Sequence, residues 1–292
     1  MKNSALIKYL FALILFGSYG IVASYISLTS LEIVLLRTLI GSLLLIILFF
    51  LSGRKLSFYR YKKQFAFLCV SGVAMGESWM FLYEAYFRIG VSIATLLYYC
   101  GPVIVMVLSP LLFKEKLTVY KIIGLILVVI GVFLTNGSIP DGKRDIFGVV
   151  CGLMSAVTYA IMVIFNKKSN KIAGLENAVL QLLTAFLTVA VFVAIKQGLY
   201  LHISGVSIFP ILVLGLLNTG IGCYLYFSSI GKIPVQTVAV LGYLEPLSAV
   251  ILSVIFLKEE MLPFQIIGAV LILGGAIIGE NKISPTRKGG FS

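Results

Sequence analysis

Two acidic residues, Glu77 and Glu245, lie in the middle of long apolar stretches of the chain. The stretches are Gln64–Tyr86 and Val235–Leu257, and each is long enough to span a bilayer. A charged side chain at the centre of a bilayer costs roughly 2.5–3.5 kcal/mol on insertion scales, so such residues usually have a function. The only tryptophan, Trp79, is two residues from Glu77, and tyrosines surround both acids. A carboxylate combined with aromatic faces is suited to holding an organic cation.

The side chains around Glu77 do not all share one helical face. Trp79 and Tyr83 form an i, i+4 pair, whereas Glu77 is about 200° from Trp79 on a regular helix. We expect Trp79 and Tyr83 to line a cavity, and Glu77 to act as a counter-charge or proton carrier. The alternatives are an interfacial aromatic belt for the rings and a protonated, hydrogen-bonded structural role for Glu77.

Glu245 precedes Pro246, which frees backbone carbonyl groups and can open a helix locally. Glu245 is therefore a second candidate for substrate contact, with a role in helix structure as the alternative. Other tyrosines at depth in apolar stretches are candidates for an aromatic cage, although each alone can equally be a packing residue. They are Tyr19, Tyr98, Tyr99, Tyr159, Tyr224, Tyr226 and Tyr243, of which Tyr243, Tyr98, Tyr159 and Tyr19 are the leading candidates.

Composition excludes a soluble globular protein. The chain is 60% hydrophobic and 12% charged, against about 25% charged in soluble domains, and its mean hydropathy is +1.09. The net charge of +12 does not indicate nucleic-acid binding, because the basic residues lie in short loops between apolar runs. The four cysteines show no metal-ligand spacing, no ATP-binding GxxxxGK[ST] motif is present, and no nucleophile–base pattern stands out. We therefore predict neither an enzyme nor a protein with a metal or cofactor.

The spacing of apolar runs predicts an all-α membrane protein with ten transmembrane helices. These are expected near residues 5–28, 31–52, 64–86, 92–113, 118–135, 146–165, 175–195, 206–229, 235–257 and 262–280. With the N-terminus inside, the inner segments carry 17 Lys and Arg residues and the outer segments carry 5. This bias predicts that both termini are cytoplasmic.

The two halves of the chain repeat one another at a shift of 144 residues. The matched positions are Tyr99 with Tyr243, Pro102 with Pro246, Glu115 with Glu259, Gly124 with Gly268, and Gly131 with Gly275. We predict a first five-helix repeat at 1–136 and a second at 137–292. Five spans per half invert the second repeat, an arrangement typical of secondary transporters with a substrate site near the midplane.

The doubled unit, Arg37 early in the second span, and the Pro102…Glu115 and Pro246…Glu259 patterns resemble the drug/metabolite transporter superfamily in its ten-helix EamA-type branch. The segment Gly76–Tyr86 further resembles bacterial choline permeases of the phosphorylcholine-decoration pathway. The resemblance implies two bundled halves that rock about a central cavity.

The leading hypothesis is a secondary transporter in a bacterial plasma (inner) membrane that takes up a small quaternary ammonium, with choline as the first candidate. A proton is a candidate coupling ion, while the transport direction and oligomeric state are left open. The alternatives are export of cationic drugs, export of amino acids or other metabolites, and a membrane enzyme or scaffold. Amino-acid export requires a basic group for the α-carboxylate, and the sequence shows no obvious basic residue at the midplane.

Overall fold

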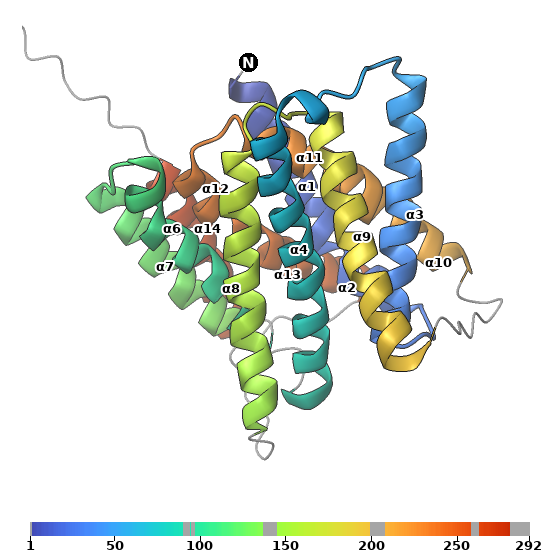
Figure 1. Ribbon diagram of the computed structural model, residues 1–292. Helices are drawn as coiled ribbons and strands as arrows, with labels where there is room; N and C mark the ends of the chain where they lie inside the picture. The colour runs from blue at the N-terminus through green and yellow to red at the C-terminus, as the bar shows by residue number, and fades with distance from the viewer. Residues whose placement is uncertain are drawn as a thin grey trace, which may run out of the picture.

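The computed structural model describes residues 2–89, 94, 97–136, 145–198, 208–257 and 263–280. Within these ranges the chain is helical and contains no β-strand. The helices pack side by side in one bundle, with α6 and α7 at the left edge of Figure 1 and α3 at the right. In chain order the helices are α1 (Lys2–Gly17), α2 (Tyr19–Ser24), α3 (Ser30–Leu51), the 3-10 turn η1 (Phe58–Arg60), α4 (Lys62–Ile89), α6 (Cys100–Phe113), α7 (Val119–Asn136), α8 (Ile146–Lys168), α9 (Leu175–Gln197), α10 (Ile208–Val213), the π-helical η3 (Leu214–Ile221), α11 (Gly222–Ile230), α12 (Val235–Gly242), α13 (Leu244–Leu257) and α14 (Pro263–Glu280).

Six helical segments are long and apolar enough to cross a membrane. They are Ser4–Ala23, Leu31–Leu51, Lys62–Tyr86, Ile146–Lys168, Leu175–Lys196 and Ile208–Ile230. Shorter apolar helices cover Cys100–Phe113, Val119–Leu134 and Ile266–Gly279. Described helices therefore lie within every one of the ten ranges predicted from the sequence, although several are short or interrupted.

Two of the predicted spans are each divided into two helices. The first is interrupted at Ser18, between α1 and α2, and the ninth at Tyr243, between α12 and α13. At the first break, the Asn218 side-chain amide donates to the carbonyl oxygen of Leu15 at 2.6 Å and to Ser18 Oγ at 2.8 Å. The Leu15 carbonyl also accepts from the backbone N–H and the hydroxyl of Ser18, so three polar groups gather on the carbonyl at this interruption.

Helices α7 and α14 pack through glycines that the repeat relates to one another. A Cβ atom on Gly124 would lie 2.5 Å from the carbonyl oxygen of Gly275, and one on Gly131 would lie 2.6 Å from that of Gly268. Only glycine allows the two backbones to approach this closely. The contacts also run in opposite order along the two helices, so α7 and α14 are antiparallel.

One end of the bundle, uppermost in Figure 1, carries the basic connections from α3 to α4 and from α8 to α9, and we call it the basic end. Here the Glu115 carboxylate accepts hydrogen bonds from the backbone N–H of Val235 at 2.9 Å and of Gln236 at 3.1 Å. It therefore caps the start of α12, where a negative charge is favourable. The Lys167 ammonium donates to the carbonyl oxygen of Ile230 at 3.0 Å, close to the end of α11. The Glu115 hydrogen bonds fasten the two halves of the chain together at the basic end, whereas the Lys167 contact joins α8 to the end of α11 within the second half.

At the opposite end, which we call the far end, an ionic network joins α4, α8 and α9. The Arg88 guanidinium lies 2.7 Å from Glu84 Oε1 and 2.9 Å from Asp145 Oδ2. Lys196 Nζ lies 3.6 Å from Glu84 Oε2. Asp145 is also the N-cap of α8 and accepts from the backbone N–H groups of Phe147 and Gly148.

The far-end network gives stability a defined pH dependence. The Arg88 hydrogen bond, and then the backbone N–H of Gly148, hold the pKa of Asp145 below its ordinary value of 3.8. Ionised Asp145 therefore stabilises the fold above the unfolded-state pKa, and this contribution is lost as the pH falls through the lower folded-state pKa. We expect Asp145→Asn, which keeps a capping side chain, to lower the melting temperature modestly at pH 7 and to have no effect once the pH is below the folded-state pKa. A melting series over pH in detergent checks this, and an equal loss at both ends of the series would contradict it.

Candidate functional site

The interior of the bundle holds six tyrosines from five helical regions, which we call the tyrosine cluster. Its members are Tyr9, Tyr98, Tyr99, Tyr159, Tyr226 and Tyr243. The rings of Tyr98 and Tyr159 are 5.3 Å apart, as are those of Tyr9 and Tyr226. The hydroxyl oxygens of Tyr159 and Tyr226 lie 3.4 Å from one another and join these two pairs. The result is a continuous aromatic surface inside an apolar protein.

Hydrogen bonds to backbone carbonyls fix two members of the cluster. The Tyr9 hydroxyl donates to the carbonyl oxygen of Val238 at 2.8 Å, in α12. The Tyr243 hydroxyl donates to the carbonyl oxygen of Tyr99 at 2.7 Å, and their rings are 6.0 Å apart. Tyr99 and Tyr243 each stand at the start of a half-helix, α6 and α13 respectively. The aromatic surface therefore surrounds the point where these interrupted helices meet.

Glu245 lies in the first turn of α13, and its side chain is half-buried. Its carboxylate is within electrostatic range of Tyr9, Tyr98 and Tyr159 of the cluster. The positive end of the α13 dipole interacts favourably with a negative charge at this position. No Lys, Arg or His nitrogen of the described residues lies within 4.0 Å of the carboxylate. The arrangement thus offers one carboxylate near aromatic rings, without a direct ion-pair partner among the described residues.

A second group, which we call the arginine cluster, consists of Tyr19, Arg37, Trp79 and Tyr83. The Arg37 guanidinium carbon lies 3.9 Å from the ring centre of Trp79 and 4.7 Å from that of Tyr19. The rings of Tyr19 and Tyr83 are 6.3 Å apart. The chain therefore places its own cation on the aromatic faces that the sequence analysis assigned to a substrate cation. Trp79 is half-buried and Tyr83 is buried, and the Arg37 guanidinium covers one face of the Trp79 indole.

The two clusters belong to one interior. Arg37 is within electrostatic range of both Glu245 and Tyr98. A positive group on α3 and a negative group on α13 are thus close enough to interact, with aromatic rings near both. Arg37 is a buried basic residue of this interior, 7% exposed and stacked on the rings of Tyr19 and Trp79. Arg37 is the residue that a substrate carboxylate would need.

Glu77 lies on the opposite side of α4 from this interior. It shares a helical face with Val70 and Val73, whose side chains are 43% and 36% exposed. On other faces of α4, Ser78 donates to the carbonyl oxygen of Ser155 in α8, and Gly76 packs against α9. Glu77 is therefore half-buried on an outward-facing side of α4, between the contacts that Ser78 makes with α8 and Gly76 makes with α9. On the regular helix α4 it is about 200° from Trp79, as the sequence analysis set out, so the two side chains lie on different faces.

The structure divides the other predicted site residues between the two clusters. The tyrosine cluster holds Tyr98, Tyr159 and Tyr243 beside Glu245, and the arginine cluster holds Tyr19, Trp79 and Tyr83. Sequence reasoning named Tyr226 among the tyrosines at depth but missed Arg37 and Tyr9 as site candidates. For Arg37 a signal existed, because it is a charged residue inside a predicted span and so deserved the same treatment as the two glutamates. No comparable signal marks Tyr9.

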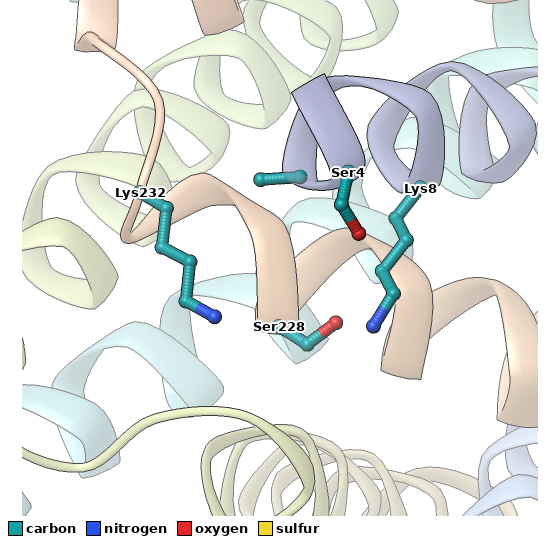
Figure 2. A pocket seen from close by; sticks show the side chains of 5 residues that line it. Ser4, Lys8, Ser228 and Lys232 are labelled. Carbon is teal, nitrogen blue, oxygen red and sulfur yellow. The ribbon is translucent and has the colours of Figure 1, made fainter. Parts of the chain in front are cut away.

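A shallow pocket of about 100 Å³ opens at the basic end between α1 and α11. It is lined by Ser4, Ala5, Lys8, Ser228 and Lys232. Figure 2 shows the side chains of Lys8 and Lys232 reaching toward Ser228 from opposite sides. Two ammonium groups make this pocket unsuitable for an organic cation. Within the described ranges, no three His, Cys, Asp or Glu side chains are grouped so that they could hold a metal ion.

Comparison with known families accounts for this arrangement. The model of the EamA-like transporter family matches the chain twice, at residues 3–137 and 146–278. The chain belongs to the EamA-like transporter family. An EamA-like transporter is a multi-pass membrane protein, which agrees with the six long apolar helices. Each match covers one of the two halves that the 144-residue shift relates.

Curated relatives of this EamA-like chain are named as transporters. The uncharacterized transporter YxxF of Bacillus subtilis is 25% identical over 99% of this chain and 94% of its own length. The uncharacterized transporter YvbV of the same organism is 27% identical over 85% of this chain and 81% of its own length. A solved structure, titled only as the crystal structure of a protein, superposes with a TM-score of 0.82 over 96% of this chain and 99% of that one, at 19% identity. This last likeness supports the fold alone.

Proposed function

We propose that this EamA-like transporter is a secondary carrier of a small quaternary ammonium compound, with choline as the first substrate to test. The observation that carries the proposal is the position of Glu245 among the rings of Tyr9, Tyr98 and Tyr159. A carboxylate neutralises the charge of the cation, while aromatic faces attract its methyl groups by roughly 0.5–2 kcal/mol each. A hydrophobic, uncharged substrate would make no use of the carboxylate.

We further propose a layout of ten transmembrane helices in two inverted repeats, 1–136 and 137–292, in a bacterial plasma membrane. Three observations support it. The family model matches once in each half, the repeat-related helices α7 and α14 are antiparallel, and the repeat-related residues Tyr99 and Tyr243 are hydrogen-bonded to one another. The bias of Lys and Arg toward one set of loops supports two cytoplasmic termini.

The same contacts suggest how the carrier works. Glu115 holds the two halves together at the basic end, which is the cytoplasmic end in this layout. Substrate enters from the far end, displaces water from the aromatic surface and neutralises Glu245. Rocking of the halves then breaks the basic-end contacts and forms others at the far end. A proton and a substrate cation compete for Glu245 in this scheme, which makes a proton the candidate coupling ion.

Amino-acid export is the second candidate, because Arg37 provides the basic group that an α-carboxylate needs. Export of cationic drugs would use the same Glu245 and tyrosines as choline uptake. That alternative differs in transport direction and in the range of substrates, both of which a vesicle assay measures.

The proposal predicts that choline raises the melting temperature of the purified protein. A ligand present at about 100 times its dissociation constant stabilises the folded state by roughly 2.7 kcal/mol, provided it binds only that state. Ethanolamine is expected to do much less, because it lacks the methyl groups that spread the charge over an aromatic face. Uptake of radiolabelled choline into vesicles that contain only this protein completes the test. Stabilisation by serine but not by choline would favour amino-acid transport instead.

A further inference from the structure

Three buried polar atoms of the arginine cluster have no hydrogen-bond partner of good geometry among the described residues, although the Tyr19 hydroxyl lies close to the Arg37 guanidinium. They are Arg37 Nε, the Tyr19 hydroxyl and the Tyr83 hydroxyl. Arg37 is 7% exposed and Tyr83 is 9% exposed, so bulk water does not serve them. Leaving a buried polar group unpaired costs on the order of 1–3 kcal/mol, and more when the group is charged. Three such atoms in one place therefore mark a position built for something that the unliganded protein does not supply.

The geometry of the stack explains why these donors remain available. Tyr19 and Trp79 cover the guanidinium of Arg37 at 4.7 Å and 3.9 Å, measured to the ring centres. Stacking uses the face of the planar group and leaves its N–H bonds directed sideways, in the plane. The Tyr19 hydroxyl lies beside the guanidinium, and the ring of Tyr83 is 6.3 Å from that of Tyr19. The Arg37 N–H can only donate, and each tyrosine hydroxyl can also donate, so an oxygen acceptor is the one partner that all three groups can share.

We propose that Arg37, Tyr19 and Tyr83 form an acceptor-oxygen subsite for the transported molecule. The subsite adjoins the cation subsite at Glu245, with which Arg37 is in electrostatic range. This inference rests on the proposed function for the cation half of the substrate. The two subsites together select a quaternary ammonium that carries an oxygen acceptor. A carboxylate suits the subsite better than a hydroxyl, because a charge-assisted hydrogen bond is about twice as strong as a neutral one.

A ligand series with one constant head group isolates the subsite. Tetramethylammonium has no oxygen, choline has a hydroxyl oxygen, and glycine betaine has a carboxylate, while all three carry methylated ammonium. We expect affinity to rise in that order, by about tenfold or more between the first and the last, as a charge-assisted bond predicts. Binding is read from the fluorescence of Trp79, the only tryptophan in the chain, which lies in the arginine cluster itself.

Tyr83→Phe is the decisive variant, because it keeps the ring and removes only an unpaired hydroxyl. We expect its melting temperature to be unchanged or higher without ligand, since an unsatisfied buried group disappears. The preference for glycine betaine over tetramethylammonium is expected to fall about fivefold, as the loss of one hydrogen bond to a charged group predicts. If the Tyr83 hydroxyl only supports the structure, Tyr83→Phe should instead lower the melting temperature and leave the preference for glycine betaine unchanged. Tyr25→Phe, at a residue that is 60% exposed, is the matched control and should change neither quantity.

Arg37→Gln removes the charge and is expected to abolish the preference within the series. If Arg37→Gln does not fold, Tyr83→Phe alone decides the matter. Equal binding of all three ligands by the wild-type protein, or an unchanged preference in Tyr83→Phe, overturns the acceptor subsite and leaves the cation carrier standing. Failure of tetramethylammonium and choline to bind at all, with Arg37-dependent binding of acetate, overturns the cation carrier and leaves the acceptor subsite standing.

Discussion

Replacing Glu245 with glutamine is expected to abolish transport of the quaternary ammonium substrate while the protein still inserts and folds. Glutamine has nearly the same shape and keeps hydrogen-bonding capacity, but it cannot neutralise a cation or carry a proton. A hydrogen bond or contact to a charged group is worth roughly 1.5–3 kcal/mol, so affinity should fall by about tenfold or more. Because Glu245 has no ion-pair partner within 4.0 Å among the described residues, the substitution breaks no direct ion pair, although the Arg37 charge in electrostatic range loses its opposite charge.

Glu77→Gln is the matched control for this prediction. Both substitutions remove one acid from the middle of an apolar segment, but Glu77 faces outward with Val70 and Val73. We expect Glu77→Gln to bind and transport choline much as the wild-type protein does. Normal transport by Glu245→Gln together with a dead Glu77→Gln would reverse the assignment of the two acids. Activity in both variants would show that neither acid carries the substrate's charge.

The contrast between the two acids shows how far sequence reasoning reached. The sequence gives the angle between Glu77 and Trp79, because a regular helix fixes it. It does not give which of the two faces the interior, since that depends on the packing of α4 between α8 and α9. For Glu245 the sequence was more informative. Pro246 predicted a local opening of the helix, and the break at Tyr243 lies three residues before it.

Other features of the fold were outside the reach of local patterns. No proline marks the break at Ser18, which is sustained by Asn218, a residue 200 positions away in the chain. The repeated Glu115 and Glu259 were recognised as a pair, but the structure was needed to show that Glu115 caps α12 in the other half. Glu259 lies outside the described residues. The stacking of Arg37 likewise joins residues of α2, α3 and α4, and only tertiary structure brings these together.

The second large effect is expected for Trp79→Ala. The indole covers one face of the Arg37 guanidinium at 3.9 Å, and its removal leaves the cation free to turn away from the acceptor subsite. Truncating a packed tryptophan to alanine typically costs about 3–5 kcal/mol of stability. We expect a lower melting temperature and a loss of about tenfold or more in choline affinity, because a binding group that must be re-ordered binds less well. Since this variant has no tryptophan, the measurement is the ligand-induced shift in melting temperature.

Trp79→Phe distinguishes an effect of Trp79 on affinity through Arg37 from a direct contact between the indole and the substrate. Phenylalanine keeps an aromatic face for Arg37 but offers a weaker cation–π contact than indole. If Trp79 acts by holding Arg37, the phenylalanine variant should regain most of the affinity, and Arg37→Gln combined with Trp79→Ala should lose little more than either change alone. Additive losses in the double variant would mean that indole contacts the substrate directly, as a free aromatic face would. Unchanged choline affinity in folded Trp79→Ala would instead leave Trp79 as a packing residue and separate the arginine cluster from the substrate site.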